Sequence, residues 1–173
     1  MWSASASAAP LAFVRRSRAK ARSFRSGGRS GSEAEVPIGR TADSPRRDAP
    51  VLLQKAEEFL RTAVRAEEAG DRDAAMLASI HAAITANDAV CVALLSKHST
   101  DPDHQRAADL LETAGDRAPG AGQHAGQLRA LLKKKNLVEY EARRASVAEA
   151  RDALERATRF VSWARDVVGE ASS

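Results

Sequence analysis

Residues 131–143 read LLKKKNLVEYEAR, and this stretch is the most informative part of the sequence for both fold and function. At about 100° per residue it predicts a helix with an apolar face formed by Leu128, Leu131, Leu132, Val138 and Ala142. Lys135 and Glu139 project from the middle of that face. Because an unpaired charge in an apolar core is costly, two charges at central positions indicate either the edge of a helical bundle or a polar site.

A second apolar helix with polar insertions is predicted over residues 74–97. Its apolar face is formed by Leu77, Ile80, Ile84, Cys91 and Leu95. Asp88 projects into this arc, and His81 and Asn87 lie at its borders. Two such helices favour facing polar groups around one shared pocket, where Asp88 would pair with Lys135. A solvent-accessible ion pair at a helix crossing would give the same pattern, so both interpretations stay open at this point.

The composition favours a helical protein with an aliphatic core. The chain has 173 residues, enough for one ordinary domain, and 43% of them are hydrophobic but only 4% are aromatic. Alanine, leucine, arginine and glutamate are prominent, and these are strong helix formers. Since no long alternating strand pattern occurs, we predict an all-α fold, a bundle of four to five helices preceded by a disordered tail.

Five helical segments are predicted within residues 51–170, which form one domain. They span residues 51–69, residues 73–97, a segment that begins at Asp101-Pro102, residues 123–143, and a last segment that ends near residue 169. The last segment opens with Ser146-Val147-Ala148-Glu149, a capping box. Phe160, Trp163 and Val167 lie beside its main apolar stripe. They either cover the ends of the bundle or form a second apolar surface, which would suit a homodimer.

Residues 1–50 are predicted to form a disordered basic tail. They contain ten Arg and Lys residues against four Asp and Glu residues, whereas residues 51–173 contain seventeen against nineteen. The stretch 15–29 mixes Arg, Ser, Gly and Ala without helical or strand periodicity. The tail is interpreted as a leader from a mis-called start, as an arm that contacts nucleic acid, or as a targeting peptide. The domain itself has no basic excess that would indicate nucleic-acid binding.

The residue types argue against several classes of site. Cys91 is the only cysteine, so it forms no internal disulfide, and we predict a cytoplasmic location. No apolar run approaches 18 residues, which argues against a membrane span. The four histidines, His81, His98, His104 and His124, have no metal-ligand spacing, and no glycine-rich phosphate loop is present. We therefore expect neither a metal ion nor a cofactor.

Several groups of residues carry a resemblance to a known family. They are SIHAAI at residues 79–84, NDAVC at residues 87–91, Asp103-His104 followed by Ala107, Ala108, Leu110 and Leu111, and KNLVEYEAR at residues 135–143. With these residues the chain from about residue 51 to residue 169 resembles HEPN domains, and in particular a compact subgroup of uncharacterised bacterial HEPN proteins. HEPN domains are short helical bundles named for higher eukaryotes and prokaryotes nucleotide-binding.

The resemblance implies a site in the last of these groups. Catalytic HEPN families carry an arginine, often followed by a polar residue, and then a histidine, and they act as metal-independent ribonucleases, usually as dimers. Here Lys135 stands at the arginine position, Asn136 at the polar position and Tyr140 at the histidine position. Lysine keeps the positive charge but loses the bidentate fork of arginine. A tyrosine with an ordinary pKa near 10 is poorly suited to proton transfer near neutral pH.

Two functions remain open, and a purely structural dimerising bundle is a third. The first is a HEPN-type module that binds a nucleotide, RNA or a partner protein without efficient catalysis. Its polar pocket would lie between the second and fourth helices, lined by Asp88, Asn87, Asn136, Glu139 and Arg143. The second is a toxin-like metal-independent ribonuclease with Lys135 and Tyr140 as catalytic residues. For a ribonuclease the resemblance implies a nucleotidyltransferase antitoxin as partner. For either function it implies a homodimer.

Overall fold

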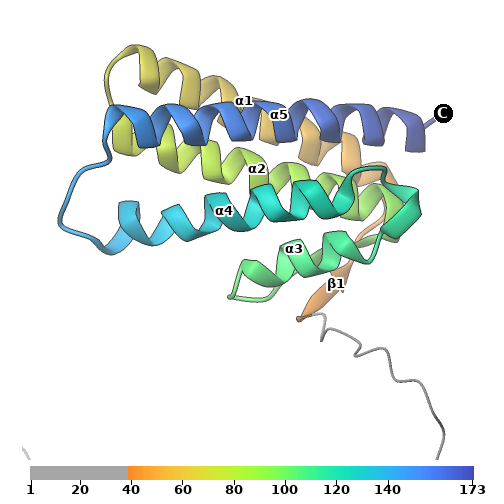
Figure 1. Cartoon of the computed structure of the whole chain (residues 1–173). Coiled ribbons are helices and arrows are strands. Elements are labelled where there is room, and N and C mark those ends of the chain that lie inside the picture. The colour runs from red at the N-terminus through yellow and green to blue at the C-terminus, as the bar shows by residue number, and fades with distance from the viewer. Residues whose placement is uncertain (1–38) are drawn as a thin grey trace, which may run out of the picture. The chain divides into compact units, whose positions relative to one another are not determined.

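The computed structural model describes residues 39–173, and within them only the backbone of Asn136, Leu137 and Tyr140. It contains five α-helices, which confirms the predicted bundle (Figure 1). They are α1 (Ala49–Glu68), α2 (Arg72–Leu95), α3 (Gln105–Glu112), α4 (Ala121–Tyr140) and α5 (Val147–Ala171). Two 3-10 helices, η1 (Arg46–Asp48) and η2 (Gly115–Arg117), and two strands, β1 (Thr41–Asp43) and β2 (Lys97–Ser99), complete the described part.

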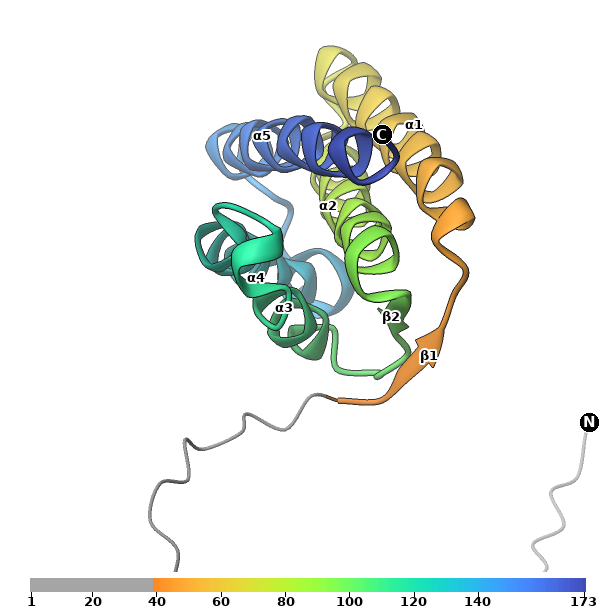
Figure 2. The same ribbon diagram turned by 90° about the vertical axis from the view of Figure 1, so that its right-hand side faces the viewer.

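Helix α2 is the central element, because it contacts each of the other four helices. Seen along the bundle, α1, α2 and α5 form one group, and α3 and α4 form a pair beside α2 (Figure 2). A helix with neighbours on several sides needs small or apolar residues all round. Helix α2 meets this need with alanines, among them Ala75, Ala82, Ala86 and Ala89, which are fully buried. Within residues 39–173 it is also the one helix long and apolar enough to cross a membrane, but 67% of that window is buried inside the bundle.

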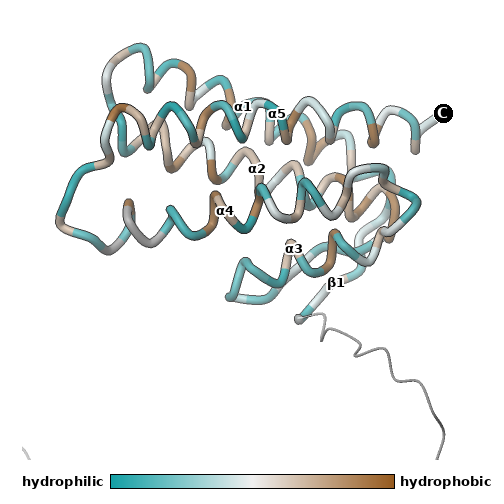
Figure 3. The backbone as a smooth tube through the Cα atoms, viewed as in Figure 1, coloured by the Kyte–Doolittle hydropathy of each residue, from teal (hydrophilic) through white to brown (hydrophobic). Residues whose placement is uncertain are grey.

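The core lies between α2, α4 and α5 and is aliphatic, as the composition predicted. The largest fully buried side chains include Phe160, Met76, Ile80, Leu111, Leu128 and Leu131. Hydrophobic residues recur along each helix rather than in one block, as the colouring of Figure 3 shows. The predicted apolar face of α4 is therefore confirmed at Leu128, Leu131 and Leu132. Ala142 lies beyond the end of α4 at Tyr140, so it is not part of that face.

The capping box predicted before α5 is confirmed. The Ser146 side chain accepts a hydrogen bond from the backbone N–H of Glu149 at 3.2 Å, and Glu149 Oε2 accepts one from the backbone N–H of Ser146 at 2.8 Å. Two of the four unpaired N–H groups at this helix end are thereby satisfied, which fixes where α5 begins. The guanidinium of Arg143 beside Glu149 is the main cause that lowers the pKa of this carboxyl, together with these Ser146 hydrogen bonds.

The predicted boundary of the tail at residue 50 is wrong. Strand β1 pairs antiparallel with β2, with Thr41 opposite Ser99, and η1 leads directly into α1 at Ala49. Residues 41–50 therefore belong to the fold, and the strand pair escaped prediction because three residues are too few to show a period. The predicted disorder of residues 1–38 lies outside the described residues.

The predicted start of the third helix at Asp101-Pro102 is also wrong. The carboxylate of Asp101 accepts a hydrogen bond from the backbone N–H of Asp103 at 2.9 Å, and that of Asp103 accepts one from Gln105 at 3.0 Å. Aspartate side chains that bond the backbone two residues on form turns instead of helix. Helix α3 begins only after these turns, which places His104 on a turn instead of within a helix.

Two of the three residues beside the main stripe of α5 are buried within the bundle. Phe160 is fully buried and Val167 is 6% exposed. Trp163 stacks on His124 of α4, with ring centroids 4.1 Å apart, and its Nε1 donates to the carbonyl of Pro119 at 3.0 Å. Together they close the end of the bundle, so the second apolar surface suggested for a homodimer is not formed by these residues.

Candidate functional site

A polar cavity of about 250 Å³ opens beside Lys135, and we call it the Lys135 pocket. It is lined by Pro102, Asp103, His104, Gln105, Leu132, Lys135 and Glu139. Pro102, Asp103 and His104 come from the turns that lead into α3, Gln105 is its first residue, and the last three come from one side of α4. The polar side of α4 therefore faces the segment before α3, and the pocket does not lie between α2 and α4 as predicted.

Lys135 and Glu139 form an ion pair with each other within α4. Their Nζ and Oε1 atoms are 3.5 Å apart, four residues along α4, and the side chains are 20% and 28% exposed. An ion pair of this spacing at partial exposure contributes little to stability, so it is easily exchanged for other partners. The predicted ion pair between Asp88 and Lys135 is not formed, because Asp88 lies on a different cavity.

The charges in the Lys135 pocket affect two histidines. His104 lines it, and His81 of α2 is close enough for the charges of Lys135 and Glu139 to affect its titration. Burial, followed by the positive charge of Lys135, lowers the pKa of both imidazoles, while Glu139 acts in the opposite direction. The His81 ring also stacks against Phe59 of α1, with centroids 5.6 Å apart. Both imidazoles are therefore neutral at pH 7, and a neutral imidazole can accept a proton or donate its N–H.

Sequence reasoning gave His81 and His104 no role in this site. Both were noted among the residues that carry the family resemblance and among the histidines without metal-ligand spacing, and His81 also at the border of the α2 apolar arc. They are separated in sequence from Lys135 by more than fifty and thirty residues, and no local spacing connects them. The Asp103-His104 pair before an apolar helix was the one available signal, and the structure places both residues on the Lys135 pocket.

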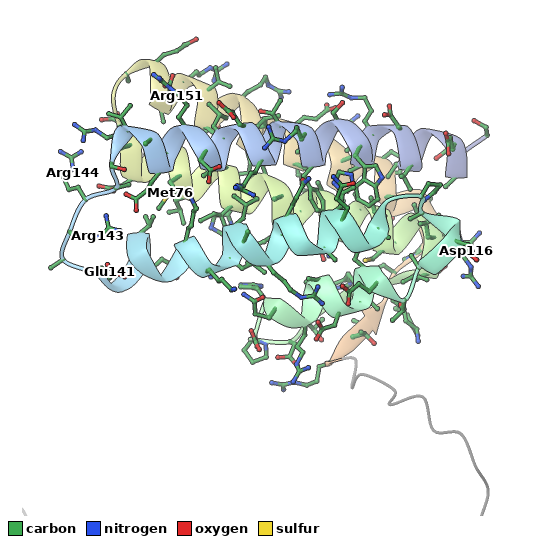
Figure 4. All side chains as sticks on the ribbon, in the orientation of Figure 1. Met76, Asp116, Glu141, Arg143, Arg144 and Arg151 are labelled. Atoms are coloured by element: carbon green, nitrogen blue, oxygen red, sulfur yellow. The ribbon has the colours of Figure 1, made fainter. Side chains whose placement is uncertain are left out.

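The other residues expected in one pocket are distributed over separate places. Asn87 is fully buried, and its Nδ2 donates to the carbonyl of Ala107 at 3.2 Å, so it joins α2 to α3. Asp88 lines a second cavity. Arg143 follows the end of α4 and pairs with Glu141 at 3.3 Å and Glu149 at 2.8 Å, in the connection to α5 (Figure 4).

Asn136 and Tyr140 lie on the last turns of α4, the same segment that carries Lys135 and Glu139. Their side chains lie outside the described part of the structure, so the predicted role of Tyr140 stays a prediction. The described residues around the cavity offer one ammonium group, one neutral imidazole and two carboxylates, and the neutral imidazole of His81 lies within electrostatic range of Lys135. Such a set can bind a phosphate oxygen through Lys135 and N–H groups through Glu139 or Asp103.

Among the residues that the structure describes, no cluster of three or more His, Cys, Asp or Glu side chains could hold a metal ion.

The chain was compared with known proteins in three ways. A family model described as the HEPN domain matches residues 49–167, which is more than half of the 173-residue chain. The match begins at the first residue of α1 and ends within α5, so it includes the segment of α4 that carries Lys135. No curated protein and no solved structure matches the chain significantly.

Proposed function

Because the chain belongs to the HEPN domain family, we propose that it binds RNA or a nucleotide in the Lys135 pocket without efficient catalysis. The observation that carries this proposal is the grouping of Lys135, His104 and Glu139 around one cavity, with His81 within electrostatic range. In the family resemblance Lys135 stands at the position of the motif arginine. The cavity gives that position a cation beside one imidazole that can form hydrogen bonds, that of His104.

The binding step is an exchange of partners. Lys135 is held by Glu139 at 3.5 Å, in a pair that is partly exposed to water. A phosphate oxygen also forms a charge-assisted hydrogen bond with an ammonium group, so it can replace Glu139 at Lys135. The released Glu139 can then accept an N–H from a base, and the N–H of His104 can donate to a second phosphate oxygen. This exchange favours a ligand that combines a phosphate with a base.

We do not propose efficient catalysis, because the pocket holds too little positive charge. Phosphoryl transfer needs positive charge around the oxygens on which negative charge develops. In the Lys135 pocket the ammonium group of Lys135 faces the carboxylates of Glu139 and Asp103, while His104 is neutral. The charge available to a developing phosphorane is therefore small, and a lysine cannot supply the paired contacts of an arginine.

A metal-independent ribonuclease is the second candidate, and one observation favours it. His81 and His104 have lowered pKa values and are neutral at pH 7, so either could accept the proton that Tyr140 is unsuited to accept. In this alternative the chain would act as a toxin with a nucleotidyltransferase antitoxin. We further propose a homodimer and a cytoplasmic location, which rest on the family and on the lone buried Cys91.

The experiment is a fluorescence-anisotropy titration of the full chain with a labelled unstructured RNA and with ATP. Lys135→Ala should weaken binding by about tenfold or more, since a hydrogen bond to a charged group contributes about 1.5–3 kcal/mol. Lys133→Ala is the matched control, because Lys133 lies two residues earlier on α4, is exposed and does not line the pocket. Equal losses in the two variants would show binding through general charge and would overturn the proposal.

The same samples decide between binding and cleavage. Incubation of the RNA with the wild-type chain in excess chelator should leave it intact under the proposed function. Cleavage that His104→Gln abolishes, and that Lys133→Ala leaves unchanged, would establish the ribonuclease alternative.

A further inference from the structure

A second cavity, of about 260 Å³, lies where the segment before α1 meets α2 and β2, and we call it the Asp88 pocket. It is lined by Ser44, Asp48, Val51, Leu52, Lys55, Asp88 and His98. It shares no lining residue with the Lys135 pocket. Its size suits a compact molecule, below the range of most drug-sized ligand sites.

Among the residues that the structure describes, one carboxyl oxygen of Asp88 has no partner. Asp88 is the one residue of α2 that lines this cavity, and its Oδ1 is buried without a hydrogen-bond partner. Buried polar groups in folded proteins are nearly always hydrogen-bonded, because an unpaired buried acceptor loses its contacts with water. Burial raises the pKa of this carboxyl to about 7, although a hydrogen bond from Asn87 acts in the opposite direction. The carboxyl is therefore close to its ionisation point at neutral pH.

The other polar groups of the cavity do not satisfy Asp88. Ser44 Oγ and His98 Nδ1 are hydrogen-bonded to each other at 2.8 Å. Lys55 also lines the cavity, but Asp88 Oδ1 has no hydrogen-bond partner among the described residues 39–173. Val51 and Leu52 of α1 supply the apolar part of the lining. The cavity thus offers two carboxyl groups, those of Asp48 and Asp88, beside an aliphatic surface, and one buried oxygen of Asp88 has no partner among the described residues.

We propose that the Asp88 pocket binds a small cationic molecule in which an amidinium, guanidinium or protonated amine is attached to a compact apolar group. The cation would donate N–H groups to the Asp88 carboxylate, and the apolar group would pack against Val51 and Leu52. A carboxylate in an apolar site is best compensated by a cation that also supplies hydrogen bonds. This ligand has the opposite charge to that of the ligand proposed for the Lys135 pocket, so the inference extends beyond the proposed function and does not depend on it.

Binding should depend on pH in a defined direction. The cation pairs with the ionised form of Asp88, so affinity falls about tenfold per pH unit below the pKa of this carboxyl and levels off above it. Asp48, Lys55 and His98 also face the cavity, and Cys91 lies beside Asp88 on α2. Burial raises the pKa of the Cys91 thiol, so this group stays protonated and does not contribute to the dependence.

The test uses benzamidine, which joins an amidinium to an apolar ring, and benzamide, a neutral molecule of nearly the same shape. Binding to the full chain is followed by isothermal titration calorimetry between pH 5.5 and pH 8.5. We expect benzamidine to bind at least tenfold more tightly than benzamide at pH 8, and its affinity to fall below pH 7.

Asp88→Asn should lower the affinity for benzamidine at least tenfold at pH 8 and abolish the pH dependence of that affinity. Asp43→Asn is the matched control, because it removes an exposed carboxylate of β1 that does not line the cavity, and it should change affinity less than threefold. Chemical denaturation of each variant verifies that it is folded. Absence of benzamidine binding up to about 20 mM, or equal affinity for the wild type and Asp88→Asn, would overturn the proposal.

Discussion

Replacement of Asp88 by asparagine should stabilise the protein at pH 8 and leave its stability nearly unchanged at pH 4. In the folded chain burial raises the pKa of Asp88 from 3.8 to about 7. Between these two pH values the folded state keeps a proton on this group that the unfolded chain has already released. Stability therefore falls as pH rises from about 4 to about 7, and is constant with respect to this group above pH 7.

The magnitude follows from the size of the shift. A difference of about three pKa units at about 1.4 kcal/mol each sets an upper limit of about 4 kcal/mol on the loss between pH 4 and pH 8. Because Asp88 lines a cavity that admits water, we expect a gain of about 2–4 kcal/mol for Asp88→Asn at pH 8. Asparagine has nearly the same shape, so the packing around it changes little.

The assay is urea denaturation of the full chain at pH 4.5, 6 and 8, with the free energy of unfolding obtained by linear extrapolation. Asp48→Asn serves as control, since this carboxylate lines the same cavity but lies at the end of η1 and not on the central helix α2. A difference between Asp88→Asn and the wild type that is the same at all three pH values would refute the reasoning. So would a variant that is less stable at pH 8.

Further predictions concern the contacts that position the two pockets. Asn87→Ala should lower the free energy of unfolding by about 1–3 kcal/mol in urea, because the buried carbonyl of Ala107 loses its donor. Ser146→Ala should cost about 1 kcal/mol through the lost cap of α5, but Ser146→Gly only a few tenths, as measured by the same assay. Removal of residues 1–38 should leave Tm nearly unchanged in calorimetry, whereas removal of residues 1–48 should lower it by about 5 °C or more, because β1 and η1 are lost.

The helices could be predicted because their signals are local. The apolar face of α4 and the Ser146 capping box depend on residues within a few positions of one another, and the structure confirms both. The start of α3 was missed because Asp101 and Asp103 bond the backbone in turns, which compete with a helix at the same residues. Proline after aspartate is compatible with either outcome.

The pocket could not be predicted from helical periodicity alone. A periodicity gives the angle of Asp88 and Lys135 around their own helices, but not the neighbour that each one faces. Helix α2 has buried alanines on several sides, so its polar residues do not share one exposed face. Asn87 contacts α3, whereas Asp88 lines the Asp88 pocket. The approach of His104 to Lys135 depends on the turns before α3, whose geometry no periodic pattern describes.

The most direct test of the central proposal is an NMR titration of the histidine ring protons of the full chain, with and without a saturating RNA oligonucleotide. In the free protein burial and Lys135 lower the pKa of His104. A phosphate bound at Lys135 would oppose that positive charge, so the account predicts that the pKa of His104 rises when RNA binds, with a smaller rise at His81. His124, which stacks on Trp163 away from this pocket, should titrate as before. An unchanged His104 in RNA-saturated protein would contradict the account.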